Sequence, residues 1–250
     1  MKKSLLIICL FFVFLGCEKK TLSLVKITAK TIEIDSSINK SLKYSQIIKP
    51  YKNKMNKEIN TIISYAPKDI NRYDGEMQSS LGNLLADLCL RRANLIFNKK
   101  TNNNIDFSMF NYGGIRAGIS KGEVTNKNSF ELMPFENSLV ILEMSGEKIK
   151  QLISYFIKNK KAHPLSKSIK LIINKDDSYE LRVNDQEFNS ERNYFVLTSD
   201  YLQSGGDKMN FFKNPISLFK TDYKMRHAIQ DEFKSLDTLK AQIDNRIKLD

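Results

Sequence analysis

Apolar residues recur at helical spacing along several stretches of the chain, and this spacing predicts the helices. The clearest stretch covers residues 77–98, where Ser79 or Ser80 is placed to cap the start of the helix. Gly82 lies inside this pattern, and a glycine there indicates close packing against another element. Pro50 is expected at the first turn of another helix, because proline lacks the N–H that a helix interior needs. The remaining helical stretches are residues 50–64, 147–159, 223–233 and, as a further amphipathic stretch, 236–247.

Short stretches rich in β-branched and aromatic residues predict the strands. They cover residues 25–34, 105–110, 138–144, 170–174, 179–183 and 194–198. Asp176-Asp177-Ser178 is expected to form a hairpin turn between two of them, and residues 119–125 are expected to form a turn. Since helices and strands are mixed and some strands are hairpin neighbours, we predict an α+β fold with a mixed β-sheet flanked by helices.

The start of the chain has a pattern of its own. Met1-Lys2-Lys3 is basic, and residues 5–15 form an unbroken apolar run that is too short to cross a bilayer as a helix. A basic start, an apolar run and a small residue before Cys17 are typical of a secretory signal. Because Leu-Gly-Cys resembles a bacterial lipobox, we predict a signal peptide over residues 1–16 and lipidation of Cys17. The alternative is a plain signal peptide with an incidental cysteine.

This assignment sets the expected domain organisation and location. We expect residues 17–34 to be a tether and a first strand, and residues 35–250 to form one domain, a size that is usual for a single core. A lipid on Cys17 would attach the protein to a membrane of the bacterial cell envelope, on its periplasmic or surface face.

Composition narrows the classes of partner. The formal net charge is +12, but the lysines are scattered and no nucleic-acid motif accompanies them. We therefore interpret the charge as a generally basic surface and expect no nucleic-acid polymer as a partner.

The cysteines predict no internal disulfide. With Cys9 in the signal peptide and Cys17 lipidated, only Cys89 remains. Cys89 is expected to be a small core residue, the alternative being a catalytic thiol.

No catalytic centre is visible in the sequence. The chain has two histidines, His163 and His227, and neither lies in a cluster with metal-ligand spacing, so we predict both to be surface residues. The motifs of serine hydrolases, phosphate-binding loops and Cys-His pairs are also missing. We therefore expect no metal, no cofactor and no catalytic residues in this chain.

The first binding signal is the loop after residues 105–110. Asn111 offers both a donor and an acceptor, and Arg116 offers a planar fork of donors that suits a phosphate or a base edge. An ion pair with an acidic neighbour is the alternative for Arg116. Gly113 and Gly114 between them allow a close approach of the backbone to a ligand, or a positive φ.

Two later loops share this character, and we expect all three to converge on one site. Phe135 follows a proline, and Tyr201 follows an aspartate, so both rings lie in loops where they can stack on a planar base. The alternative for each ring is that it covers the core. Gly206 precedes Asp207, whose carboxylate can accept hydrogen bonds from an amine or from ribose hydroxyls.

The loops belong to a set of ordered motifs that resembles the C-terminal domain of bacterial and animal 5′-nucleotidases. The resemblance covers about residues 35–225 and rests on Leu81-Gly82-Asn83-Leu84-Leu85-Ala86-Asp87, Asn111-Tyr112-Gly113-Gly114-Ile115-Arg116, Met133-Pro134-Phe135, Ser145-Gly146 and Thr198-Ser199-Asp200-Tyr201-Leu202-Gln203-Ser204-Gly205-Gly206-Asp207. It implies a nucleoside pocket in which Asn111 and Arg116 contact the base or nearby groups. Phe135 and Tyr201 would stack on the two faces of the base, and Asp207 would contact the ribose.

The sequence departs from the family at three places. Family members carry an N-terminal metallophosphoesterase domain with two metal ions, and we expect that machinery to be absent from this chain. Many members have an arginine where this chain has Gly75, so one expected ligand contact is missing. Many also have phenylalanine where Tyr201 stands, and tyrosine keeps the stacking face while adding a hydroxyl.

Three functions follow from this resemblance. The leading hypothesis is a split 5′-nucleotidase, in which this chain binds the nucleoside and a separate metallophosphoesterase chain supplies the divalent metals and hydrolyses nucleoside 5′-phosphates. The second is a lipid-anchored protein that captures nucleosides or nucleotides without catalysis. The third is a decayed domain that serves as a scaffold, which would have no need of the pocket residues.

Overall fold

The computed structural model describes residues 22–250, and the chain divides into two units, residues 1–48 and 49–250. The predicted signal peptide and Cys17 lie outside the described residues. The strand predicted over 25–34 is wrong, because residues 22–34 have no helix or strand and every side chain there is exposed. An extended segment forms a strand only where a neighbouring strand pairs with its backbone. The partly alternating sequence of residues 25–34 does not show whether such a neighbour exists.

Helix α2 covers Leu42–Ile59, longer than predicted, and Pro50 lies inside it rather than at its first turn. The helix tolerates the proline because its residues near Pro50 are exposed, so that water can satisfy the backbone carbonyl left without a partner. The helix ends five residues before the predicted end, and strand β1 follows over Ile62–Ala66. No helix within residues 22–250 is both long enough and apolar enough to cross a membrane.

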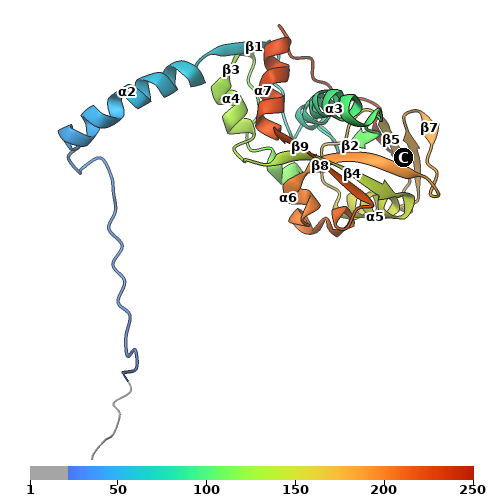
Figure 1. The fold of residues 1–250 in the computed structure, drawn as a ribbon, viewed down its shortest axis with the longest axis horizontal. Coiled ribbons are helices and arrows are strands. Elements are labelled where there is room, and N and C mark those ends of the chain that lie inside the picture. The colour runs from blue at the N-terminus through green and yellow to red at the C-terminus, as the bar shows by residue number, and fades with distance from the viewer. Residues whose placement is uncertain (1–21) are drawn as a thin grey trace, which may run out of the picture. The chain divides into compact units, whose positions relative to one another are not determined.

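The second unit is organised around a mixed four-stranded sheet in the order β2-β8-β4-β9 (Figure 1). Its strands are β2 (Phe107–Ser108), β4 (Ser138–Ser145), β8 (Asn193–Ser199) and β9 (Ser217–Lys224). Strand β2 runs parallel to β8, while β8 and β4, and β4 and β9, are antiparallel. The predicted α+β fold with a mixed sheet is confirmed. Strand β9 was missed as a strand, and it is largely exposed at the edge of the sheet.

Successive side chains of β4 belong to two separate hydrophobic cores. Leu139 and Ile141 belong to the core beneath helices α3 and α7, whereas Val140 and Leu142 belong to the core beneath helix α5. Because successive side chains of a strand point to opposite faces, the sheet is covered on both sides, as Figure 1 shows. The helices are α3 (Ser80–Thr101), α5 (Gly146–Asn159) and α7 (Met225–Ser235).

Helix α3 confirms three sequence predictions. The Ser79 hydroxyl caps its start by accepting a hydrogen bond from the Gly82 N–H at 3.0 Å. A side chain at Gly82 would meet Pro164 at 3.5 Å and the cap itself at 2.9 Å, so the glycine does mark close packing. Cys89 is fully buried, and burial raises the pKa of its thiol well above the ordinary range. The thiol therefore stays protonated, which suits a core residue and not a nucleophile.

Smaller sheets and short helices complete the unit. The elements are β3 (Gly122–Thr125), which pairs with β1; β5 (Ile169–Ile173), β6 (Tyr179–Val183), β7 (Gln186–Glu187) and β10 (Ile247–Leu249), which form a second four-stranded sheet; and α4 (Asn126–Leu132), α6 (Asp200–Gln203), η1 (Tyr112–Gly114), η2 (Gly206–Lys208) and η3 (Asn210–Phe212). The predicted hairpin turn between β5 and β6 is confirmed. The turn predicted over 119–125 is wrong in part, because β3 occupies most of it.

The amphipathic stretch over 236–247 is not a helix. Leu239 and Ala241 are buried while Lys240 between them is exposed, which is the alternation of an extended segment. The Leu239 N–H donates to the Tyr65 carbonyl at 2.8 Å, so the segment runs beside β1. The C-terminal segment therefore lies along the folded unit and does not add a helix to it.

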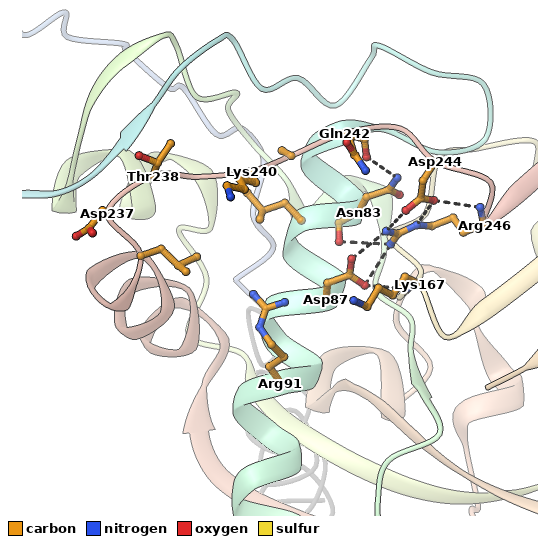
Figure 2. A pocket seen from close by; sticks show the side chains of 13 residues that line it. Asn83, Asp87, Arg91, Lys167, Asp237, Thr238, Lys240, Gln242, Asp244 and Arg246 are labelled. Carbon is orange, nitrogen blue, oxygen red and sulfur yellow. Dashed lines mark hydrogen bonds and ion pairs between the residues drawn. The ribbon is translucent and has the colours of Figure 1, made fainter. Parts of the chain in front are cut away.

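A buried ion-pair network fastens this C-terminal segment to α3 (Figure 2). The Arg246 side chain is 3% exposed, and its guanidinium donates to Asp87 at 2.9 Å and to Asp244 at 2.7 Å. It also donates to the Leu165 carbonyl at 2.6 Å. Burial alone would raise the pKa of Asp244, but the hydrogen bonds and charge of Arg246 hold it below its ordinary value. The network borders a surface hollow of about 750 Å³, and its guanidinium is occupied by hydrogen bonds within the network.

Candidate functional site

The three loops singled out in the sequence lie at one edge of the central sheet. Strands β2 and β8 are parallel, so the loops that follow them leave from the same edge. Strand β4 is antiparallel to β8, and the pairing of Leu139 with Ser199 places the segment before β4 beside the segment after β8. The strand order alone therefore brings together residues that are distant in the sequence.

These loops enclose a cleft of about 220 Å³. Its lining consists of Asn111, Gly113, Gly114, Arg116, Phe135, Asn137, Tyr201 and Asp207. Of the residues predicted for the site, only Gly206 is not in the lining. A side chain at Gly206 would meet the Tyr201 ring at 2.5 Å, so this glycine lets the ring lie directly against the backbone. Asn137 was not predicted, although its loop was.

Asp207 is the polar centre of the cleft. One carboxylate oxygen accepts from the Tyr201 hydroxyl at 2.8 Å, and the other accepts from the Asn111 amide at 2.8 Å. The hydrogen bond to Asp207 raises the pKa of Tyr201, so the hydroxyl keeps its proton and acts as a donor. A carboxylate has about four acceptor positions. Asp207 therefore retains acceptor capacity on both oxygens.

Two aromatic rings and an arginine form the rest of the cleft. Tyr201 is 42% exposed, which leaves its ring accessible. Phe135 is half-buried and packs against the core, so the alternative that it covers the core holds in part. The Arg116 guanidinium lies 4.9 Å from the centroid of the Phe135 ring, a cation–π contact, and Arg116 makes no ion pair within residues 22–250. The alternative of an acidic neighbour for Arg116 is thus not found in that range.

Gly114 is required by a close approach and not by its backbone angle. A side chain there would meet the Asn111 amide oxygen at 2.9 Å. Neither Gly113 nor Gly114 has a positive φ. A positive φ is therefore not the reason for the glycine pair, and a close approach of the backbone to a ligand stays a prediction. At Gly114 the structure shows close packing within the loop, which leaves the Asn111 side chain room to reach Asp207.

The position of the missing family arginine has no room for a side chain. A Cβ at Gly75 would lie 2.6 Å from the Ile243 side chain and 2.8 Å from the Gln78 carbonyl. Arg72, from the same connection, donates to the Ile115 carbonyl, and its guanidinium lies 4.9 Å from the centroid of the Tyr112 ring. Arg72 thus reaches the loop between Asn111 and Arg116. No motif in the sequence distinguishes it from other cations.

His163 is buried behind the cleft, and the prediction of a surface residue is wrong for it. It is 4% exposed, and its Nδ1 accepts a hydrogen bond from the Tyr112 N–H at 3.1 Å, at the base of the Asn111 loop. Burial lowers the pKa of His163 to about 4, against a smaller opposing effect of the Asp207 charge. The surface position was predicted because His163 precedes Pro164 in a polar loop, whereas tertiary packing covers the His163 side chain. His227 is exposed, as predicted.

The buried neutral histidine predicts a pH dependence of stability. Its pKa is lower in the folded than in the unfolded chain, so the unfolded chain binds more protons between pH 6.5 and about 4. The contribution of neutral His163 to the free energy of unfolding is therefore fully present above pH 6.5. The free energy of unfolding falls by about 3 kcal/mol as the pH drops through that window. Urea unfolding at pH 7, 5.5 and 4 is expected to show this loss in the wild type and in the control His227→Asn, but a smaller one in His163→Asn. An unchanged pH profile in His163→Asn would contradict this account.

No group of three or more His, Cys, Asp or Glu side chains able to hold a metal ion occurs within residues 22–250. The cleft itself offers one carboxylate, two amides, an arginine and aromatic faces. This set can bind a planar heterocycle and a hydroxyl-bearing group, and it does not resemble a metal centre.

Comparison with known proteins assigns the family. Residues 61–214 match the model of the 5′-nucleotidase C-terminal domain, which is more than half of the chain. This protein therefore belongs to the 5′-nucleotidase C-terminal domain family. One similar protein is the trifunctional nucleotide phosphoesterase protein YfkN of Bacillus subtilis, which is 24% identical over 92% of this chain and 17% of its own length. A 5′-nucleotidase of Vibrio vulnificus is 28% identical over 48% of this chain and 21% of its own length.

The fold agrees with that assignment. The crystal structure of a 5′-nucleotidase precursor from Thermus thermophilus superposes with a TM-score of 0.67 at 21% identity, over 82% of this chain and 42% of that one. The chain thus spans less than half of this solved neighbour and about a fifth of the curated relatives above. The likeness covers the domain described here and not the whole of those proteins.

Proposed function

We propose that this chain binds a nucleoside or nucleotide in the cleft between its three loops. The observation that carries the proposal is the convergence of Phe135, Tyr201 and Asp207, from separate parts of the chain, on one cleft. Stacking on an aromatic ring suits any base, because every base has a π-face. In this proposal the two rings hold the base, and Asp207 accepts hydrogen bonds from the sugar.

The remaining residues of the cleft have supporting roles in the proposal. Asn111 and Arg116 contact the base or a neighbouring group, and Gly113, Gly114 and Gly206 keep the walls close to the ligand. Without Lys2 and Lys3 of the proposed signal peptide the formal net charge of +12 becomes +10 (12 − 2), and this basic charge favours the approach of an anionic nucleotide over long range. Arg72 adds a cation next to the Asn111 loop.

For catalysis, we propose that the chain acts as the nucleoside-binding half of a split 5′-nucleotidase. A separate metallophosphoesterase chain would hold the divalent metals and activate the attacking water, and the two together would hydrolyse nucleoside 5′-phosphates to nucleosides and phosphate. Two-metal sites stabilise both the attacking and the leaving oxygen of such a displacement.

The split-enzyme proposal predicts that activity depends on both chains. Phosphate release from AMP is measured with this protein alone, with the candidate metallophosphoesterase alone and with the mixture. The mixture is expected to be faster by about tenfold or more, since a positioned substrate reacts more readily than a free one. If the phosphoesterase alone is as fast and as selective as the mixture, the proposal is wrong.

The second candidate is a binding protein that captures nucleosides or nucleotides without catalysis, and the same cleft favours it. Calorimetry with adenosine and AMP separates the two candidate functions. Tight binding that no partner changes supports capture, whereas no binding to either ligand overturns both candidate functions.

For both candidate functions we place the protein in the bacterial cell envelope, attached to a membrane through lipid on Cys17. Metabolic labelling with a fatty acid, compared between the wild type and Cys17→Ser, tests the anchor.

A further inference from the structure

Asp207 has an unusual backbone conformation that its surroundings hold in place. Its φ and ψ are 52° and 25°, in the left-handed region that non-glycine residues rarely occupy. Its N–H donates to the Tyr201 hydroxyl oxygen at 3.3 Å, and its carbonyl accepts from the Tyr155 hydroxyl at 2.8 Å. Strained residues of this kind persist only where neighbours determine them, and they cluster at binding sites.

The Tyr201 hydroxyl contacts Asp207 at two points. It accepts from the backbone N–H and donates to one carboxylate oxygen at 2.8 Å, while Asn111 donates to the other oxygen. These bonds fix the carboxylate between Tyr201 and Asn111. The ring that carries the hydroxyl is itself fixed, because it lies directly on the Gly206 backbone.

A carboxylate held in this way is suited to a pair of neighbouring hydroxyls. Each oxygen already accepts one hydrogen bond and keeps a second acceptor position. Two adjacent hydroxyls of one sugar can donate to the two oxygens at once, and such bonds to a charged acceptor are the strong ones. A carboxylate that is free to rotate would lose this advantage, because it would have to be ordered by the ligand itself.

We propose that the hydroxyl of Tyr201, beyond the stacking surface of its ring, determines sugar specificity by fixing the Asp207 carboxylate for a vicinal diol. This inference rests on the proposed nucleoside-binding function. It assigns Tyr201 a second role, that of a positioning residue acting through Asp207, which a phenylalanine at this position could not fill.

The test compares two ligands with the same base, adenosine and 2′,3′-dideoxyadenosine, by calorimetry. Wild type is expected to prefer adenosine by about tenfold or more, the value of one charge-assisted hydrogen bond. Tyr201→Phe keeps the ring, so its affinity for the dideoxy ligand is expected to stay within about twofold, while its affinity for adenosine falls about tenfold. Tyr65→Phe removes a tyrosine hydroxyl from an exposed residue outside the cleft, and it is expected to keep the preference.

The outcomes separate the two proposals. If wild type binds neither ligand, the proposed function and this inference both fail. If wild type binds both but Tyr201→Phe weakens them equally, or binds adenosine more tightly than wild type does, the nucleoside site stands and the role of the hydroxyl is overturned. Thermal unfolding of each variant confirms that the ring substitution leaves the fold intact.

Discussion

Arg246→Ala is expected to lower the free energy of unfolding by about 3–5 kcal/mol, the usual cost of removing one partner from a buried ion pair. The side chain is 3% exposed and serves Asp87, Asp244 and the Leu165 carbonyl together. Without it, two carboxylates that are 17% and 29% exposed lose their counter-charge, and a buried carbonyl loses a donor. The C-terminal segment would then keep only apolar contacts and the bond from the Asn83 amide to the Gln242 carbonyl as its links to α3. Urea unfolding at pH 7 measures the loss.

A matched control lies on the surface of the same unit. The Lys170–Asp185 pair has side chains that are 51% and 77% exposed, so Lys170→Ala is expected to cost less than about 1 kcal/mol. The contrast between the two variants tests whether burial gives the Arg246 network its importance. Equal losses in both variants would contradict the role of burial, and a loss below about 1 kcal/mol for Arg246→Ala would show that the network contributes little.

The double variant Phe135→Ala, Tyr201→Ala is expected to lose most of the affinity for adenosine. Base–aromatic stacking contributes about 1–3 kcal/mol per ring. Removing both rings should therefore weaken binding by about 30-fold to 10⁴-fold. Tyr201 is exposed and its loss should leave the fold intact, whereas Phe135 also packs on the core and its loss should lower stability as well.

Calorimetry with adenosine checks this, with circular dichroism and thermal unfolding to confirm that the double variant is folded at the assay temperature. Phe130→Ala is the control, because Phe130 is 43% exposed, close to the exposure of Tyr201, but lies on α4 outside the cleft. It should bind adenosine as wild type does. An unchanged affinity in the double variant would mean that the rings belong to the core and that no base lies between them.

Elements set by local patterns could be predicted from the sequence, and those set by partners could not. The α3 face, its serine cap and the β-rich run that forms β4 are local properties, and the predictions of this helix, its cap and this strand hold. Residues 25–34 alternate like a strand but have no neighbouring strand. Residues 236–247 have apolar residues that fit a helix as well as an extended segment, and only the backbone of β1 decides between them.

The candidate site shows the same division. Motif loops identified nearly all of the lining, because glycines, amides and aromatic residues clustered after strands are a local signal. The sequence could not show that Tyr201 bonds to Asp207, that Arg72 reaches the Asn111 loop, or that His163 is buried. Each of these features depends on how segments that are distant in the sequence pack against one another. A single sequence does not show which distant segments are in contact.

The family match ends at residue 214, yet the structural unit continues beyond it. Strand β9 pairs with β4, and helix α7 supplies Ala228, Ile229 and Phe233 to the same core as α3. The matched segment and the cooperative folding unit are therefore different lengths of chain. A recombinant fragment cut at the similarity boundary would expose one edge of the central sheet and one face of α3, and an unpaired sheet edge of this kind promotes aggregation. Domain transplantation between members of this family should keep the residues through β10 with the binding loops.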